Sequence, residues 1–259
     1  MKIAVCIKQV VTREWQLRVN DQKTWIRDQD ASFELNEPDA YALEEALRLK
    51  EKHGGEVVVC CAGPARSAQV IREALARGAD RAIHVEADSL AVADAFVVAD
   101  ALAAALREEQ FDLVLTGLQS DDQGFGQVGV VLAEKLGMPH ATIIMEVQAD
   151  PSAGSGQVLR VKRELEGGWF QWMALPLPAL LTIQSGINQL RYATVKGIMA
   201  AKKKEIKKVT PAGGGQATLR VTSVYFPEKG KKTQMLSGSP ADAAKELVKR
   251  LREDARVIQ

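Results

Sequence analysis

The strongest constraint on the fold is a regular alternation of short apolar runs with longer amphipathic segments, separated by turns that contain glycine. The chain opens with a β-branched run at residues 2–10, which predicts a strand buried on both faces. Residues 37–53 then show helical periodicity. Gly54-Gly55 ends that helix, because glycine tolerates the left-handed conformation past a helix end.

The same alternation continues through the first half of the chain. It predicts further strands at residues 56–61, 81–85, 111–116 and 141–147, and further helices at residues 65–77, 89–109 and 126–136. Short connections between such elements imply right-handed crossovers. The sequence therefore predicts an α/β fold with a parallel, doubly wound nucleotide-binding sheet and helices on both faces.

The pattern changes after residue 150, where the chain no longer alternates in this way. We expect a turn at residues 152–156, two antiparallel strands at 157–164 and 169–175, a strand at 177–183, a linker at 211–215, a short strand at 218–225, and an amphipathic helix at 240–253 with Ser239 as its N-cap. Three parts are expected: an α/β domain (1–183), a recognition loop with a basic segment (184–208), and a C-terminal extension (209–259) that packs on a partner subunit.

Composition excludes several classes of function. The 259 residues are 46% hydrophobic and carry a net charge of +1, so neither a disordered chain nor a nucleic-acid-binding protein is expected. No apolar run approaches the roughly 20 residues that span a bilayer. Cys6, Cys60 and Cys61 are too few and too irregularly spaced for a disulfide framework or a metal site. We expect buried reduced thiols and a cytoplasmic protein.

The most informative segment is residues 117–129, which follows a predicted strand and leads into a helix. Ligands of open α/β sheets bind at such strand ends. Glycines let backbone N–H groups approach a phosphate, and a helix N-terminus adds partial positive charge. Gly124, Gly126 and Gly129 fit the pattern G-x-G-x-x-G, although the motif is not at the first strand–helix turn, and a plain tight loop is the alternative.

Two other segments are expected to reach the same crevice. Asn36 to Asp39 precedes or begins the first long helix, where Asn36 and Asp39 would otherwise serve only as helix caps. Ala62 follows the second strand. No Ser–His–Asp or Cys–His arrangement, paired-carboxylate motif or lysine-bearing P-loop is evident in the sequence. A nucleotide crevice of this kind favours a carrier or a binding protein over a self-sufficient enzyme.

Several stretches together resemble the β subunit of electron transfer flavoproteins, in family order and at family spacing across nearly the whole chain. The stretches are Val5–Val10, Asn36 with Ala42–Glu51, Ala74–Ala82, Gly117-x-Gln119, Arg163-Glu164-x-Glu166-Gly167-Gly168, Leu177-Pro178-Ala179, Arg191-Tyr192-Ala193-Thr194, Ile198-Met199 and Lys202-Lys203-Lys204. The family also belongs to the wider α/β group related to adenine nucleotide alpha hydrolases.

The resemblance implies a heterodimer with an α subunit, which holds FAD in a cleft that the β subunit helps to close. In the standard form the β crevice binds AMP, and in electron-bifurcating relatives it binds a second FAD. By position, the nucleotide contacts are Cys6, Asn36, Glu37, Pro38, Asp39, Ala62, Gly117, Gln119, Ser120, Asp121, Asp122, Gln123, Gly124, Phe125, Gly126, Gln127 and Val128.

The resemblance also implies partner contacts. Docking of flavin-dependent dehydrogenases falls on Tyr192, Val195, Ile198 and Met199, and Glu164 occupies the position of an acidic residue that pairs with an arginine of the α subunit near the flavin. The acceptor would be a quinone oxidoreductase or another redox protein. Trp169, Phe170 and Trp172 are interpreted as core or subunit-interface residues rather than flavin-stacking residues.

Three functions remain open at this stage. The first is an electron carrier, which loads electrons from dehydrogenases such as acyl-CoA dehydrogenases. The second is electron bifurcation with NADH as donor, since Gly126-Gln127-Val128-Gly129 is near the Ala-Gln-Val-Gly of bifurcating relatives, although Phe125 and Gly124 depart from their Thr and Asp. The third is a non-redox adenine-nucleotide-binding module, against which the tract from Arg191 to Lys204 argues.

Overall fold

The computed structural model describes residues 1–150, 158–211, 216–227 and 233–258. The strands are β1 (Lys2–Ile7), β2 (Gln9–Val11), β3 (Phe33–Leu35), β4 (Glu56–Gly63), β5 (Arg81–Glu86), β6 (Leu113–Gly117), β7 (His140–Asp150), β8 (Val158–Glu164), β9 (Phe170–Pro176), β10 (Ala179–Ile183) and β11 (Ile206–Val209). The helices are α1 (Glu37–His53), α2 (Ala68–Arg77), α3 (Ala95–Arg107), α4 (Val128–Leu136), α5 (Val195–Ala201) and α6 (Pro240–Glu253), with 3-10 turns η1 (Ala65–Ser67), η2 (Asp88–Val92) and η3 (Glu166–Gly168).

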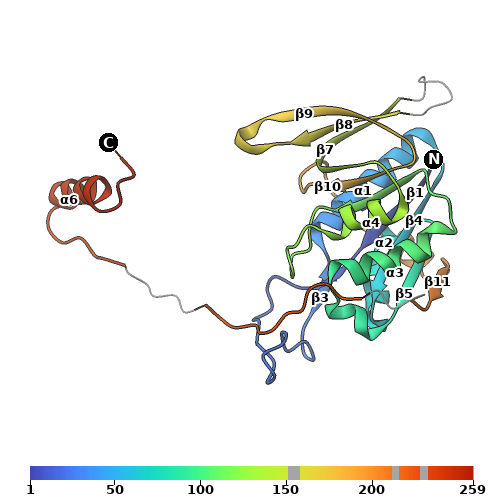
Figure 1. The fold of residues 1–259 in the computed structure, drawn as a ribbon, viewed down its shortest axis with the longest axis horizontal. Helices are drawn as coiled ribbons and strands as arrows, with labels where there is room; N and C mark the ends of the chain where they lie inside the picture. Colours follow the sequence, from blue (N-terminus) through green and yellow to red (C-terminus); the bar gives the residue numbers. More distant parts are fainter. Residues whose placement is uncertain (151–157, 212–215, 228–232, 259) are drawn as a thin grey trace. The chain divides into compact units, whose positions relative to one another are not determined.

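The predicted α/β class is confirmed. Nine strands form one sheet in the order β11-β5-β4-β1-β6-β10-β7-β8-β9, and β2 pairs with β3 in a separate small sheet (Figure 1). Pairing is parallel from β11 to β7 and antiparallel from β7 to β9. The hairpin predicted about the glycine turn at residues 166–168 is present as β8 and β9.

Alternate residues of the central strand face the two layers of helices. Ile3 and Val5 pack in one core cluster with residues of α1 and α2, whereas Ala4 and Cys6 pack in a second cluster with residues of α3 and α4. This period-2 alternation explains why the strand reads as one continuous apolar run, since both of its faces are buried. The helices thereby cover both faces of the sheet, as expected.

Two predicted elements are divided in the structure. The run at residues 2–10 splits at Lys8, whose backbone N–H donates to the Asp39 carboxylate at 2.7 Å, and the chain then leaves the large sheet to form β2. The helix expected at 89–109 is the turn η2 followed by α3. Asp94 separates them, because its side chain accepts the Val97 N–H at 2.9 Å and so starts a new helix.

The segment after residue 184 is more ordered than the sequence indicated. Residues 195–201 form α5, and residues 206–209, for which the sequence predicted no strand, form β11 beside β5. Conversely, no strand is assigned to the described residues of 218–225, where a strand was expected. The turn predicted at 152–156 and most of the linker predicted at 211–215 lie outside the described residues.

The chain divides into two units, one from Met1 to Ser223 and one from Val224 onward. The second unit contains α6, which begins as predicted at Ser239, whose hydroxyl accepts the Asp242 N–H at 3.3 Å. Its apolar residues Leu247 and Val248 are exposed. Among the described helices of both units, none has the length and apolar character that crossing a membrane requires.

We predict that Asp94→Ala destabilises the protein more than Asp94→Ser. Oδ1 of Asp94 caps α3, and Oδ2 accepts from the backbone N–H groups of Thr218 at 2.6 Å and Leu219 at 2.9 Å. Serine keeps a cap but loses the second oxygen, whereas alanine loses both, at a cost of about 0.5–2 kcal/mol for the cap alone. Urea unfolding measures the difference, and equal stability of the two variants would contradict the cap. Hydrogen exchange at Thr218 and Leu219 should quicken in both variants.

Candidate functional site

A cavity that is open at its mouth lies at the carboxyl ends of β1, β4 and β6. The strand β1 lies between the other two in the sheet, and the chain builds the sheet outward from β1 first through β4 and later through β6. The cavity is therefore at the point where strand order reverses, which is where open α/β sheets bind ligands.

Most of the predicted nucleotide residues line this one cavity. Those that do are Cys6, Asn36, Asp39, Ala62, Gly117, Gln119, Ser120, Gln123, Phe125, Gly126, Gln127 and Val128. The remaining five predicted residues, Glu37, Pro38, Asp121, Asp122 and Gly124, are outside its lining but belong to the same two segments. The three segments expected to converge, at residues 36–39, at Ala62 and at 117–128, do so.

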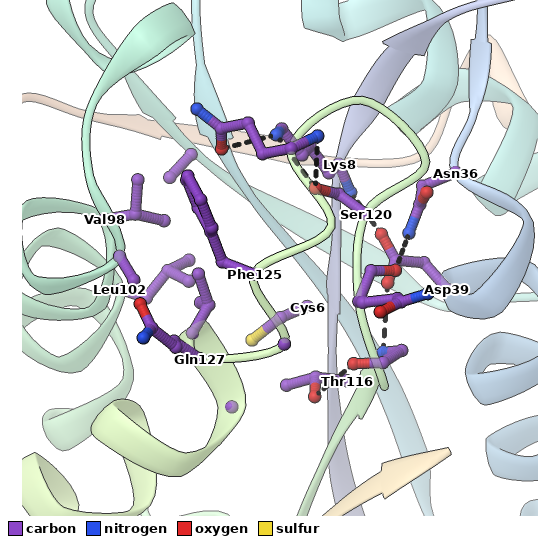
Figure 2. A pocket seen from close by; sticks show the side chains of 18 of the residues that line it. Cys6, Lys8, Asn36, Asp39, Val98, Leu102, Thr116, Ser120, Phe125 and Gln127 are labelled. Carbon is purple, nitrogen blue, oxygen red and sulfur yellow. Dashed lines mark hydrogen bonds between the residues drawn. The ribbon is translucent and has the colours of Figure 1, made fainter. Parts of the chain in front are cut away.

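Asn36 fastens the loop that follows β6. Its Nδ2 donates to the Gln119 carbonyl at 3.0 Å (Figure 2), and its Oδ1 accepts the Asp121 N–H at 2.9 Å. The side chain thus pairs with the loop backbone as a neighbouring strand would, and only 1% of the residue is exposed. Its alternative interpretation as a side-chain cap of α1 is wrong, because both ends of the amide are engaged by the loop.

Asp39 joins the ends of two strands. One carboxylate oxygen accepts the Lys8 N–H at 2.7 Å, and the other accepts the Gly117 N–H at 3.0 Å (Figure 2). The helix-cap interpretation is wrong for this residue also. Burial raises the pKa of Asp39 to about 7, against the hydrogen bonds from Lys8, Asn36 and Gly117, which lower it. Near neutral pH the cavity floor therefore carries only part of a negative charge, which eases the approach of an anion.

Cys6 provides a neutral wall rather than a nucleophile. Burial raises the pKa of its thiol far above the ordinary range, and the negative charges of Asp39 and Cys61 raise it further. Because the thiolate is the reactive form, this thiol is inert at physiological pH. Cys60 and Cys61 are likewise buried and free, which confirms the prediction of reduced thiols.

Lys8 also lines the cavity, although it was not among the nucleotide-binding residues predicted from the sequence. Its ammonium donates to Gln123 Oε1 at 3.0 Å and to Ser120 Oγ at 3.3 Å (Figure 2). It also donates to Asp122 Oδ1 at 2.7 Å. These bonds hold residues 120–123 against the end of β1. Its position directly after β1 could have indicated a cavity contact, because the other site residues also follow the carboxyl ends of strands.

The glycines of the loop have distinct roles. Gly124 and Gly126 adopt left-handed conformations with φ of +66° and +62°, which residues with a side chain rarely adopt. Gly129, in α4, approaches its neighbours so closely that a Cβ would lie 2.6 Å from Thr116 Oγ1. Close packing here brings the start of α4 to the strand ends.

The start of α4 is suited to an anion. Among the described residues, no side chain caps this helix, and Gln127, Val128 and Gly129 at its first turn all line the cavity. Unpaired N–H groups at a helix N-terminus, together with the helix dipole, bind phosphate and carboxylate groups. This arrangement and the glycine conformations fit the phosphate-binding role that the sequence suggested.

The opposite wall is apolar and was not foreseen. Val98 and Leu102 of α3 face the cavity, and the Phe125 ring lies on the same side (Figure 2). The sequence predicted a helix here but no cavity role for it, because periodicity does not distinguish a core contact from a cavity wall. A helix start without a side-chain cap, together with an apolar wall, is the pattern of a site for a nucleotide or a similar amphipathic ligand.

The predicted partner contacts are elsewhere on the molecule. Tyr192 and Val195 are 91% and 79% exposed, and Ile198 and Met199 on α5 are also exposed. Glu164 ends β8, where its carboxylate accepts from Gln184 Nε2 at 3.3 Å. None of these five residues lines the cavity. The described part of the chain contains no group of three His, Cys, Asp or Glu side chains that could hold a metal ion.

Comparison with known proteins agrees with this geometry. The family model of the electron transfer flavoprotein domain matches residues 24–213. The chain is similar to the electron transfer flavoprotein subunit beta of Methylophilus methylotrophus, with 36% identity over 264 residues and 98% of each chain covered. It is 33% identical to the subunit beta of Bacillus subtilis and 37% identical to the mitochondrial subunit beta of Oryza sativa subsp. japonica, each over 100% of both chains. The chain therefore belongs to the electron transfer flavoprotein family, among its beta subunits.

Proposed function

We propose that this chain pairs with an α subunit to form an electron carrier. Electrons from flavin-dependent dehydrogenases, such as acyl-CoA dehydrogenases, reach FAD held mainly by the α subunit, and a quinone oxidoreductase or another acceptor receives them. The β crevice binds AMP. The redox chemistry is supplied by the bound flavin, while this chain binds a nucleotide, closes the cofactor site and docks partners.

The observation that carries this proposal is the chemical character of the cavity. It offers backbone N–H groups at α4, a carboxyl at Asp39 whose pKa burial raises to about 7, and an unreactive thiol at Cys6. Such groups bind and orient a ligand but do not attack it. A site of this kind suits a structural nucleotide better than a substrate undergoing bond cleavage.

AMP fits the two sides of the cavity. Gly126 and the first turn of α4 would hold the phosphate, and the apolar wall of Val98, Leu102 and Phe125 would contact the less polar part of the ligand. The elevated pKa of Asp39 reduces repulsion of a phosphate.

The bifurcating alternative rests on one observation. Residues 126–129, whose sequence Gly-Gln-Val-Gly resembles the Ala-Gln-Val-Gly of bifurcating relatives, all line the cavity. In that case the crevice would hold a second FAD and NADH would be the donor. A non-redox adenine-nucleotide module is the remaining alternative, and the exposed apolar residues near α5 favour a partner-dependent carrier over it.

A second surface supports pairing with an α subunit. Trp169 is 74% exposed, and Phe170 and Trp172 on the last strand at this end of the sheet are also exposed, so the interpretation of this cluster as core is wrong. Two of these rings lie against cations: Arg160 is 4.6 Å from the centre of the Trp172 ring, and Lys162 is 4.3 Å from the centre of the Phe170 ring. Exposed aromatics of this kind are enriched at protein interfaces. We propose that this face contacts the α subunit.

The nucleotide content of the co-expressed heterodimer tests the proposal. We expect one FAD and one AMP per heterodimer, measured by the absorbance spectrum and by chromatography of the released nucleotides. This chain purified alone should carry little or no flavin. Two FAD per heterodimer would establish the bifurcating alternative instead, and a heterodimer without flavin would overturn both redox functions.

We predict that Gly126→Val removes AMP from the heterodimer, whereas Gly137→Val leaves it bound. Both glycines have left-handed backbones, with φ of +62° and +66°, so valine strains each by about 1–2 kcal/mol. Only Gly126 lines the cavity, where a branched side chain blocks the backbone approach to a phosphate. Nucleotide release after heat denaturation measures retention. Equal retention in the two variants would place the phosphate elsewhere.

We predict that Val195→Asp impairs electron transfer from a partner dehydrogenase while leaving the FAD spectrum and the heterodimer intact. A charge at an exposed apolar anchor should cost about 1–3 kcal/mol of binding, or roughly 5- to 150-fold in affinity. The test measures the rate at which a partner dehydrogenase reduces the FAD of the variant heterodimer, together with the thermal stability of that heterodimer. Normal coupling in the folded variant would refute the docking assignment, and loss of stability would mean that Val195 is a packing residue.

A further inference from the structure

The exposed apolar residues near α5 lie on a backbone that is fixed at two points. We call residues 191–201 the docking segment, because it carries Tyr192, Val195, Ile198 and Met199. Apolar side chains on a mobile loop lose conformational entropy when a partner binds, and this loss weakens binding. A segment held in one arrangement beforehand avoids that loss.

The first fixed point is Arg191, whose guanidinium lies between two carboxylates of α1. Nε and Nη2 donate to the two oxygens of Glu44 at 2.7 and 3.1 Å, and Nη1 and Nη2 donate to the two oxygens of Glu51 at 2.5 and 3.2 Å. The Glu44 side chain is only 5% exposed. Paired, bidentate contacts of this type fix both the position and the plane of the guanidinium.

The chain just before Arg191 is held to the same helix. Asn188 Nδ2 donates to the Tyr41 carbonyl at 3.2 Å and to Glu45 Oε2 at 3.1 Å. These contacts come from successive turns of the surface of α1 that also carries Glu44. Residues 188–191 are therefore held along α1 directly before Tyr192, which is 91% exposed.

The second fixed point is Gly197, where α5 packs against α2. A Cβ at this position would lie 2.3 Å from the Ala76 carbonyl oxygen, so only glycine allows the two helices to approach this closely. Arg72 of α2 donates to the Ala201 carbonyl at 2.5 Å and secures the far end of α5. Thr194 caps the near end, because its hydroxyl accepts the Gly197 N–H at 3.0 Å.

We propose that Arg191 and Gly197 are positioning residues for partner recognition: they hold the docking segment in a preformed arrangement on α1 and α2 and thereby set the affinity for the dehydrogenase. This inference rests on the proposed function, since it assumes that the segment docks a dehydrogenase. Neither residue needs to touch the partner. Arg191 acts through the backbone next to Tyr192, and Gly197 acts through the placement of α5.

The test uses the heterodimer with its FAD and an acyl-CoA dehydrogenase reduced by its acyl-CoA substrate. Arg191→Gln and Gly197→Ala should each raise the KM for the heterodimer roughly 5- to 30-fold with little change in kcat at saturation. The KM of Arg191→Lys should lie between those of the wild type and Arg191→Gln, because one ammonium cannot make the paired hydrogen bonds to both Glu44 and Glu51. Lys135→Gln, which removes an ion pair with Asp100 on α3, is the control and should leave KM unchanged.

Hydrogen exchange separates positioning from a general loss of stability. Backbone N–H groups of residues 192–201 should exchange faster in Arg191→Gln and Gly197→Ala, while the FAD spectrum and the exchange of β1 and β6 stay as in the wild type. Faster exchange in the segment with an unchanged KM would overturn the inference. A raised KM accompanied by global loosening would also overturn it, since the effect would then be structural.

Val195→Asp distinguishes failure of this inference from failure of the proposed function. If Val195→Asp raises the KM and Arg191→Gln does not, docking stands and positioning by Arg191 is wrong. If Val195→Asp has no effect on coupling, the docking function is wrong and the inference fails with it. Because Arg191 and Gly197 contact different helices, the same result from both variants excludes a local defect at either one.

Discussion

The rest of the structure depends on the hydrogen bonds of the Asp39 carboxylate. This carboxylate accepts hydrogen bonds from the backbone at the ends of β1 and β6, two strands that are neighbours in the sheet but distant in sequence. At Gly117 the approach is so close that a Cβ would lie 2.3 Å from the Asp39 carboxylate. These hydrogen bonds therefore fix the start of α1 against the strand ends, and the bond to the Lys8 N–H takes the backbone out of β1 after Ile7.

Helix α1, which Asp39 fixes at its first turn, connects the cavity with the docking segment. Its first turn borders the cavity through Asn36 and Asp39, and its later turns hold Arg191 through Glu44 and Glu51. A nucleotide in the crevice and a partner on the docking segment would thus act on opposite ends of one rigid helix. For an electron carrier this division is useful, since partner binding and cofactor retention require different surfaces that must keep a constant relation to each other.

Much of the fold and of the candidate site could be predicted from the sequence. The alternation of buried strands with amphipathic helices gave the α/β class, and helix α1 has its predicted bounds because Pro38 begins it and Gly54 follows it. The loop at 117–128 was expected at a strand end and lines the cavity there. By contrast, Lys8, Val98 and Leu102 were not foreseen as cavity residues, because a lysine after a strand and an apolar helix face have no pattern that distinguishes a cavity wall from surface or core.

The sequence by itself determined most elements of the α/β domain, the burial of the thiols and the family, since these depend on periodicity, glycine placement and motif order. Only the tertiary structure decided how polar side chains are used. Asn36 and Asp39 have the composition of helix caps, yet their partners are loop and strand backbone distant in sequence. The sequence predicts no strand in the lysine-rich run at 202–208, yet part of it belongs to strand β11, because the edge of β5 offers backbone hydrogen bonds that outweigh a weak local preference. Pairings of this kind depend on which groups the sheet brings together, and no local pattern records them.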